Sequence, residues 1–253
     1  MSNGTPYQTP EAELVSNEGS NFQLTEPKSV SAGQGWTWIA EGFGYFKRNP
    51  GAWIGTFIIW FIIMIVLAFI PILGQIASAL LMYVFIGGFM LGCKAQADGQ
   101  DFTVSHLFAG FSNNAGKLIV LSVLYTIIAF VIMGLTMGSA YFAMISGGSP
   151  EALAQDPMQF ALSFLIALAI LIPVAMAFWF APVLVVINNV SIGSALKLSF
   201  VGCLKNIIPF LVYGILALIL YIVACIPFFL GLLVLIPTMI ASMFAAYQSI
   251  YNN

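Results

Sequence analysis

The chain has 253 residues, of which 61% are hydrophobic and only 6% are charged, and its formal net charge is −2. Soluble globular proteins carry roughly 25% charged residues, so this chain has too little polar surface to cover a globule in water. The few basic residues are scattered, which excludes the clustered Lys and Arg surface of a protein that binds nucleic acid. The bilayer is therefore the expected solvent for most of the chain.

Residues 1–34 are rich in Ser, Asn, Gly, Pro, Thr and Glu, without any hydrophobic period. Such a segment cannot bury enough apolar area to offset its chain entropy, so we predict a disordered cytoplasmic tail. The tail lacks the basic start and the apolar core of a signal peptide, and none is expected. The three cysteines show no metal or disulfide spacing and are interpreted as reduced apolar residues.

The remaining residues, 35–253, contain six long apolar runs. A helix needs roughly 20 apolar residues to cross a bilayer core. We therefore predict an all-α polytopic membrane protein with six transmembrane helices, arranged as three hairpins that are each preceded by a short interfacial helix. The predicted spans are about 52–70, 72–92, 118–137, 159–187, 207–226 and 229–250. The fourth run is longer than a bilayer needs and contains two prolines, Pro173 and Pro182, which predict a tilted or kinked helix.

The segment from Gly35 to Arg48 concentrates five aromatic residues and ends in Lys47-Arg48. Aromatic and basic residues just ahead of an apolar run are typical of the headgroup zone of a membrane. We interpret this segment as an interfacial helix that is weakened by Gly42 and Gly44 and stopped at Asn49-Pro50-Gly51. An aromatic platform for a ligand is the alternative.

All the basic residues fall on one side of the six-span arrangement, whereas the loops on the other side carry only Glu151 and Asp156. Short loops rich in Lys and Arg are retained in the cytoplasm. Both termini are therefore predicted to be cytoplasmic, in the inner membrane of a bacterium. The basic residues are Lys28, Lys47, Arg48, Lys94, Lys117, Lys197 and Lys205.

A short pattern recurs where the chain enters each hairpin. The segments 44–49 (GYFKRN), 110–114 (GFSNN) and 202–206 (GCLKN) each place a Gly about one turn before an Asn. The chain therefore reads as three repeats of an interfacial segment followed by a helical hairpin. The alternative is that any membrane boundary favours small, amide and basic residues.

The residues Phe180-Ala181-Pro182, Ser191 through Ser199-Phe200, and Cys203-Leu204-Lys205-Asn206 form a recognisable signature. It resembles an uncharacterised family of bacterial polytopic inner-membrane proteins of unknown function. That family is in turn distantly similar to the membrane domain of some glycerophosphodiester phosphodiesterases. The catalytic domain of those enzymes has no counterpart here, so the resemblance implies a membrane domain and no phosphodiesterase activity.

No charged residue and no histidine lies inside any predicted span, and there is no phosphate loop, dinucleotide-binding glycine pattern or metal motif. We therefore expect no enzymatic activity and no cofactor, and we read His106 as a solvated loop residue. The candidate contacts to a lipid headgroup or ligand are polar residues at the cytoplasmic ends of the hairpins: Arg48, Asn49, Asn114, Lys117, Lys197, Lys205 and Asn206. In the alternative interpretation, the lysines reach lipid phosphates and the asparagines cap helices.

Two functional hypotheses follow. The first is a non-catalytic membrane protein that acts through membrane lipids or a membrane protein partner. The second is a transporter or channel for a small neutral or amphipathic solute, because Pro173 and Pro237 interrupt even-numbered spans and broken helices free backbone groups to line a cavity.

Overall fold

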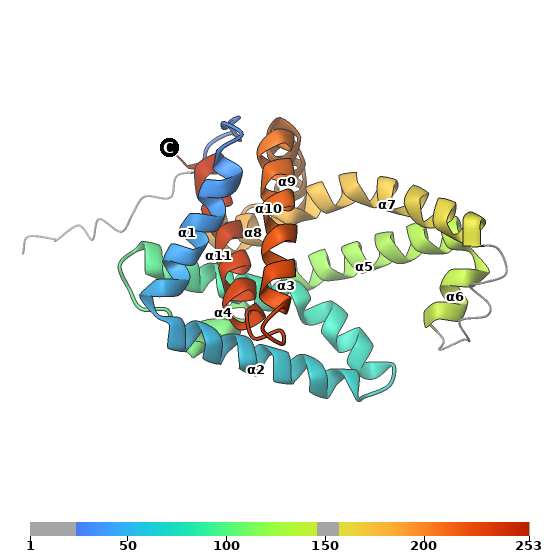
Figure 1. The fold of residues 1–253 in the computed structure, drawn as a ribbon, viewed down its shortest axis with the longest axis horizontal. Coiled ribbons are helices and arrows are strands. Elements are labelled where there is room, and N and C mark those ends of the chain that lie inside the picture. The colour runs from blue at the N-terminus through green and yellow to red at the C-terminus, as the bar shows by residue number, and fades with distance from the viewer. Residues whose placement is uncertain (1–23, 146–156, 253) are drawn as a thin grey trace, which may run out of the picture.

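The computed structural model describes residues 24–145 and 157–252, and within these ranges the chain is helical with no strand (Figure 1). Six helical segments of this part of the chain are long and apolar enough to cross a membrane. They are α2 (Pro50–Ala68), α3 (Leu73–Ala97), α5 (Ala115–Met137), α7 (Pro157–Trp179) continued by α8 (Ala181–Asn188), α10 (Ile207–Cys225) and α11 (Leu232–Tyr251). The all-α, six-span prediction is confirmed.

Each hairpin is preceded by a shorter helical segment, as predicted. These segments are α1 (Gln34–Arg48), the 3-10 helix η1 (Val104–Phe108) with α4 (Ala109–Ser112), and α9 (Ile192–Lys205). A further short helix, α6 (Ser139–Ile145), follows α5. Helix α1 buries one face, which includes Trp38 and Phe46, and leaves Trp36 and Phe43 exposed on another, so its aromatic residues divide between the protein and its surroundings.

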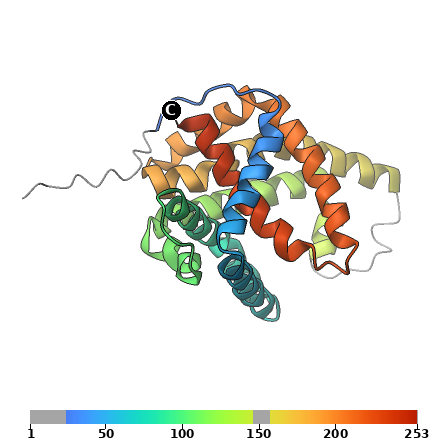
Figure 2. The same cartoon turned by 60° about the vertical axis from the view of Figure 1, so that its left-hand side comes forward.

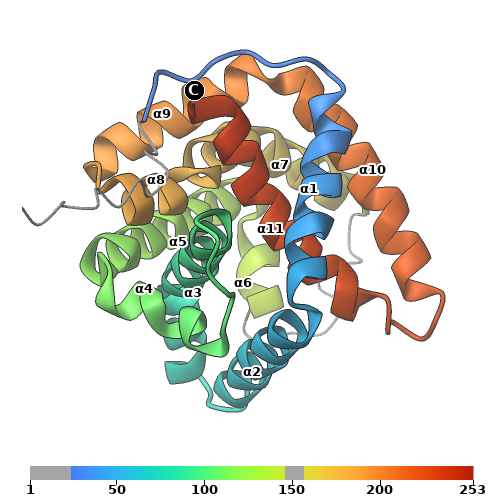
Figure 3. The ribbon, with the colours of Figure 1, turned by 90° about the vertical axis from the view of Figure 1, so that its left-hand side faces the viewer.

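Each short helical segment and the hairpin that follows it form one unit, and the short segments connect the three units in a cyclic order. Each makes its most extensive contacts with the second span of the unit before it: η1 and α4 with α3, and α9 with α7 and α8. Helix α1 has no unit before it and packs instead against α11, the last span (Figure 3). The ring of three units is thereby closed through α1.

The buried core lies at the end of the molecule that holds these segments. In α3 the buried residues run almost continuously from Tyr83 to Gln96, and in α2 they are confined to Trp53, Thr56 and Phe57 near its start. The three hairpins point in different directions away from this shared end (Figures 1 and 3). Their far halves therefore present large apolar side chains to the surroundings, as expected where lipid is the solvent.

The fourth span is broken at Phe180, just before Pro182. The hydroxyl of Ser199 on α9 accepts from the Phe180 N–H at 2.9 Å and donates to the Met176 carbonyl at 2.7 Å. These are the two backbone groups that a continuous helix would pair directly, so Ser199 is inserted into the helical ladder. Pro173, in contrast, lies inside α7 without ending it.

The stretch 1–34 was predicted to be a disordered tail, and that prediction is wrong for residues 24–33. They run from beside the C-terminus across α9 and α10 to the start of α1 (Figure 2). The Thr25 N–H donates to the Tyr251 carbonyl at 2.9 Å. The prediction of disorder considered only the apolar area that the composition of a segment allows it to bury. This segment is held instead by hydrogen bonds of its backbone, which composition does not indicate. Residues 1–23 lie outside the described residues.

Candidate functional site

The predicted site residues Arg48 and Asn49 lie together where α1 meets α2. The guanidinium of Arg48 donates to the Gln96 carbonyl at 2.8 Å, near the end of α3. The Asn49 side chain accepts from the Ala52 N–H at 3.2 Å, which caps α2, and donates to the Phe102 carbonyl at 3.2 Å. Both side chains therefore fasten this junction to the α3–η1 connection.

Asn114 and Lys117 form a second pair, at the start of α5. Asn114 adopts the left-handed backbone conformation at φ 59°, and its amide donates to the Val185 carbonyl of α8 at 3.3 Å. The Lys117 ammonium donates to the Asn189 side-chain oxygen at 2.7 Å and to the Asn189 carbonyl at 3.1 Å. The pair joins the two ends of the second hairpin.

Lys205 and Asn206 form a third pair, between α9 and α10. The Lys205 ammonium donates to the Pro27 carbonyl at 2.9 Å. Asn206 is completely buried; its amide donates to the Lys28 carbonyl at 2.9 Å and its oxygen accepts from the Val30 N–H at 2.8 Å. These two residues hold the segment of residues 24–33 in place.

The remaining candidate, Lys197, is exposed on α9 and makes no hydrogen bond to the residues that the structure describes. The seven candidates thus occupy three separate junctions and one open surface. The structure does not gather them around one pocket. The capping alternative describes Asn49, whereas the side chains of Asn114 and Asn206 cap neither of the helices that they precede. Asn114 binds a distant backbone group, and Asn206 binds distant groups as well as the Gly202 carbonyl at the end of α9, at 2.8 Å.

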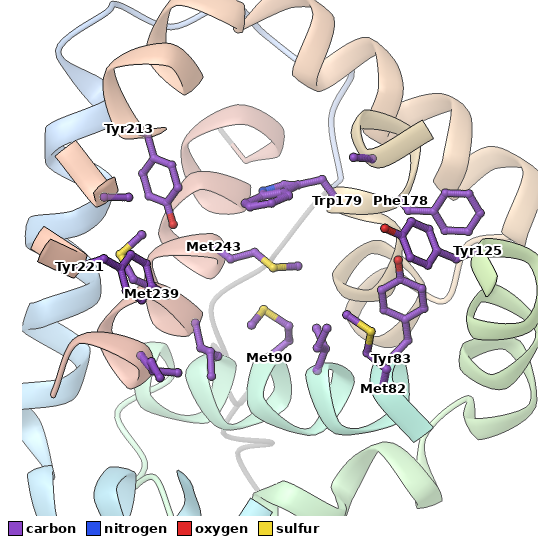
Figure 4. A pocket seen from close by; sticks show the side chains of 15 residues that line it. Met82, Tyr83, Met90, Tyr125, Phe178, Trp179, Tyr213, Tyr221, Met239 and Met243 are labelled. Carbon is purple, nitrogen blue, oxygen red and sulfur yellow. The ribbon is translucent and has the colours of Figure 1, made fainter. Parts of the chain in front are cut away.

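The structure instead shows a cavity of about 480 Å³ between the three hairpins, built from α3, α5, α7, α10 and α11 (Figure 4). Its size falls in the range of small-molecule sites, roughly 300–1,000 Å³. It is bordered by partly exposed side chains such as Met82 and Trp179, so it opens to the lipid-facing surface. Its lining residues are Met82, Tyr83, Ile86, Met90, Tyr125, Ala175, Phe178, Trp179, Tyr213, Ala217, Tyr221, Ile236, Met239, Ile240 and Met243.

The polar groups of the cavity are phenol hydroxyls and one indole N–H. Tyr213 shares a hydrogen bond of 2.8 Å with the hydroxyl of Ser242. The hydroxyls of Tyr83, Tyr125 and Tyr221 have no hydrogen-bond partner among the described residues. Tyr83 and Tyr125 pack edge to face with 6.1 Å between ring centroids, and Figure 4 shows them on one side of the cavity with Tyr213 and Tyr221 on the other.

No charged side chain lines this cavity, and four methionines do. Methionine is flexible and polarisable, so a lining of this kind adapts to an apolar guest of irregular shape. The phenol hydroxyls offer hydrogen bonds to an uncharged polar group. The arrangement suits a neutral, largely apolar molecule with one or two polar atoms.

Sequence reasoning missed the cavity because its residues come from five helices and each looks like an ordinary residue of an apolar span. The available signal was the presence of tyrosines at 83, 125, 213 and 221 inside otherwise aliphatic runs. The hydroxyl of a buried tyrosine usually finds a hydrogen-bond partner, so tyrosines inside apolar spans indicate an interior surface with polar groups or a polar guest.

A second groove, of about 590 Å³, lies between α1 and the hairpin of α10 and α11. It is lined mainly by apolar side chains, with Trp36 and Phe43 at its border. The ammonium of Lys47 lies 5.1 Å from the centre of the Phe43 ring. Aromatic and basic side chains meet here as they do at a membrane interface.

His106 contributes to local structure. Its Nδ1 accepts from the Thr103 N–H at 3.0 Å at the start of η1. In the part of the chain that the structure describes, no three His, Cys, Asp or Glu side chains come together as a metal site requires.

Comparison with known proteins gives one informative match. The chain is 33% identical over 205 residues to "Probable inner membrane protein BTH_II0599" of Burkholderia thailandensis, covering 77% of this chain and 75% of the relative. The chain belongs to the same family. No family model matches it, and no solved structure matches it. Together with the six apolar helices, the relationship makes this member of the family a polytopic membrane protein.

Proposed function

We propose that this family member is a non-catalytic inner-membrane protein that takes a neutral amphipathic molecule from the bilayer into the cavity between its hairpins. The observation that supports the proposal is the uncharged, methionine-rich cavity with unpaired tyrosine hydroxyls. A charged headgroup would lose its hydration there without gaining a partner, so it stays outside. Membrane lipids are the natural source of such a molecule, and a membrane protein partner that delivers or receives it is compatible with this role.

Filling the cavity is expected to abolish binding. Ala175 lines the cavity, so Ala175→Phe places a ring in the space that the guest would occupy. We expect native mass spectrometry of the wild type, purified in mild detergent, to show co-purified apolar molecules, and the variant to lose most of that bound mass.

The matched control is Ala169→Phe, because Ala169 lies on the same helix, is exposed and does not line the cavity. This variant should bind as the wild type does. A wild-type protein without bound molecules, or equal occupancy in Ala175→Phe, would contradict the proposal.

We also propose that both termini are cytoplasmic. The distribution of basic residues supports this orientation. The hydrogen bonds that join Thr25 and Lys28 to the C-terminal end of α11 support only the part of the proposal that puts these two segments on the same side. A fluorescent protein fused after Asn253 should fluoresce, and alkaline phosphatase fused at the same place should be inactive. Phosphatase fused after Ala152, in the connection that carries Glu151, should be active. The reverse pattern would refute the orientation.

Transport of a neutral or amphipathic solute is the second candidate. Pro173 and Pro237 lie in α7 and α11, one or two residues from the cavity-lining Ala175 and Ile236. Proline weakens a helix locally, so these two helices have a place to bend beside the cavity. Uptake or release of a bound molecule by proteoliposomes separates transport from binding alone. The distant similarity to the membrane domain of glycerophosphodiester phosphodiesterases remains a prediction.

A further inference from the structure

The tip that joins α10 to α11 consists only of apolar residues. From Ile222 to Pro237 the chain has no charged, amide or hydroxyl side chain. Phe228 is 92% exposed in the structure, and the tip stands apart from the other hairpins, at the right of Figure 3. Exposing rings of this size to water would be costly, since burying one stabilises a protein by transfer out of water.

Most backbone N–H groups of this tip are paired within the hairpin. The N–H groups of Phe228, Phe229 and Leu230 donate to the carbonyls of Ile226, Cys225 and Pro227 at 2.9, 3.2 and 3.0 Å. A turn in water can leave such groups to the solvent, but a turn in hydrocarbon must pair them within the protein.

The conformation of the tip also departs from that of a water-facing turn. Phe228 and Phe229 have φ values of 51° and 65°, in the left-handed region. Turns in water favour Gly or Asn there, because those residues adopt it at little cost. Four other positive-φ positions of the described chain follow that rule, namely Gly99, Asn114, Gly138 and Asn189, and Ile72 in the apolar α2–α3 turn does not. At this tip, two phenylalanines adopt the left-handed conformation despite its strain, which indicates that the surroundings of the tip require apolar side chains.

The hairpin is also no longer than a bilayer core is thick. Helix α10 has 19 residues, which at a rise of 1.5 Å per residue gives about 28 Å. A bilayer core is about 30 Å thick, and any tilt shortens the depth that the helix reaches.

We infer that the tip of the α10–α11 hairpin ends in the hydrocarbon of the far leaflet, packed against lipid acyl chains, and does not emerge into the water beyond. The α2–α3 tip is also apolar and has Ile72 at positive φ, but the exposed amide of Gln75 lies three residues after Ile72, so the inference is restricted to the third hairpin. In the second hairpin, the connecting sequence carries Glu151 and Asp156, whose charges require water.

Spin labelling measures the depth of the α10–α11 tip in the bilayer, and the result does not depend on which way the protein is inserted. A nitroxide is attached to Phe228→Cys in a Cys225→Ser background, because Cys93 and Cys203 are buried. The protein is reconstituted into vesicles of phosphatidylethanolamine and phosphatidylglycerol. Oxygen concentrates in hydrocarbon, whereas a water-soluble nickel chelate is excluded from it. We expect the ratio of oxygen to chelate collision rates to exceed that of the control by about tenfold or more.

The control is Ser149→Cys in the same background, in the connection that carries the two carboxylates, where collisions with the chelate should dominate. The background protein without an introduced cysteine should take up no label. If Phe228→Cys does not reconstitute as a dispersed protein, Phe229→Cys occupies the same tip and replaces it. Frequent collisions with the nickel chelate at either tip position, at the level of the control, would overturn the inference.

Discussion

Replacing Asn206 with alanine is expected to release the N-terminal segment and to lower the free energy of unfolding by about 2–4 kcal/mol. Asn206 is completely buried, and its side chain binds both Lys28 and Val30 through hydrogen bonds of 2.9 and 2.8 Å. Alanine would leave these backbone groups without their partner. Trypsin should then cleave after Lys28 faster than in the wild type, and thermal unfolding in detergent should occur at a lower temperature.

Asn113→Ala is the matched control. Asn113 is exposed, and its amide donates only within its own turn, to the Ala109 carbonyl at 2.9 Å. We expect a change in stability within about 0.5 kcal/mol and no change in cleavage after Lys28. If the two alanine variants behave alike, Asn206 does not anchor the segment.

The second large effect is expected at Gly42, where α1 crosses α11. A Cβ atom on Gly42 would lie 2.5 Å from the Thr238 carbonyl oxygen and 2.7 Å from the Ser242 nitrogen, both of them backbone atoms. Gly42→Ala should therefore push α1 away from α11 and cost about 1–3 kcal/mol of stability, as overpacking of a core does. Thermal or denaturant unfolding in detergent measures the loss.

Gly44 provides the control on the same helix. A Cβ atom there would meet no other atom within 4 Å. Gly44→Ala should raise stability by about 0.5–1 kcal/mol, because alanine loses less conformational freedom in a helix than glycine does. The two substitutions should thus have opposite signs. Destabilisation by Gly44→Ala, or none by Gly42→Ala, would contradict the packing described for α1.

The six-span architecture could be predicted because it depends on local properties of the chain. The length of each apolar run decides whether it can cross a bilayer, and that length is read directly from the sequence. Pro182 likewise predicted a kink in the fourth span, although only the structure shows that Ser199 occupies the break. The short helices ahead of the hairpins were predictable from their aromatic and basic residues.

The candidate site could not be predicted, because it depends on which distant residues meet. Lys117 and Lys205 look like residues available to a lipid phosphate until the structure shows their partners, Asn189 and Pro27. The cavity residues Tyr83 and Tyr213 belong to different hairpins, and nothing local to either indicates the other. The bound part of the N-terminal segment was missed for the same reason, since its partners lie near the other end of the chain.

The closure of the ring through α1 has a consequence for synthesis. Helix α1 leaves the ribosome first, but its main partner, α11, is made last. Until then Trp38, which is completely buried in the finished protein, can pack against Phe210 of α10 but lacks Ser249 of α11, to which it donates a hydrogen bond of 2.7 Å. Because a contact of such long range cannot form before its far partner exists, final assembly waits for the last span. A chain interrupted before α11 would keep exposed that part of the apolar face of α1 that packs against α11 in the finished protein, where chaperones and proteases can reach it.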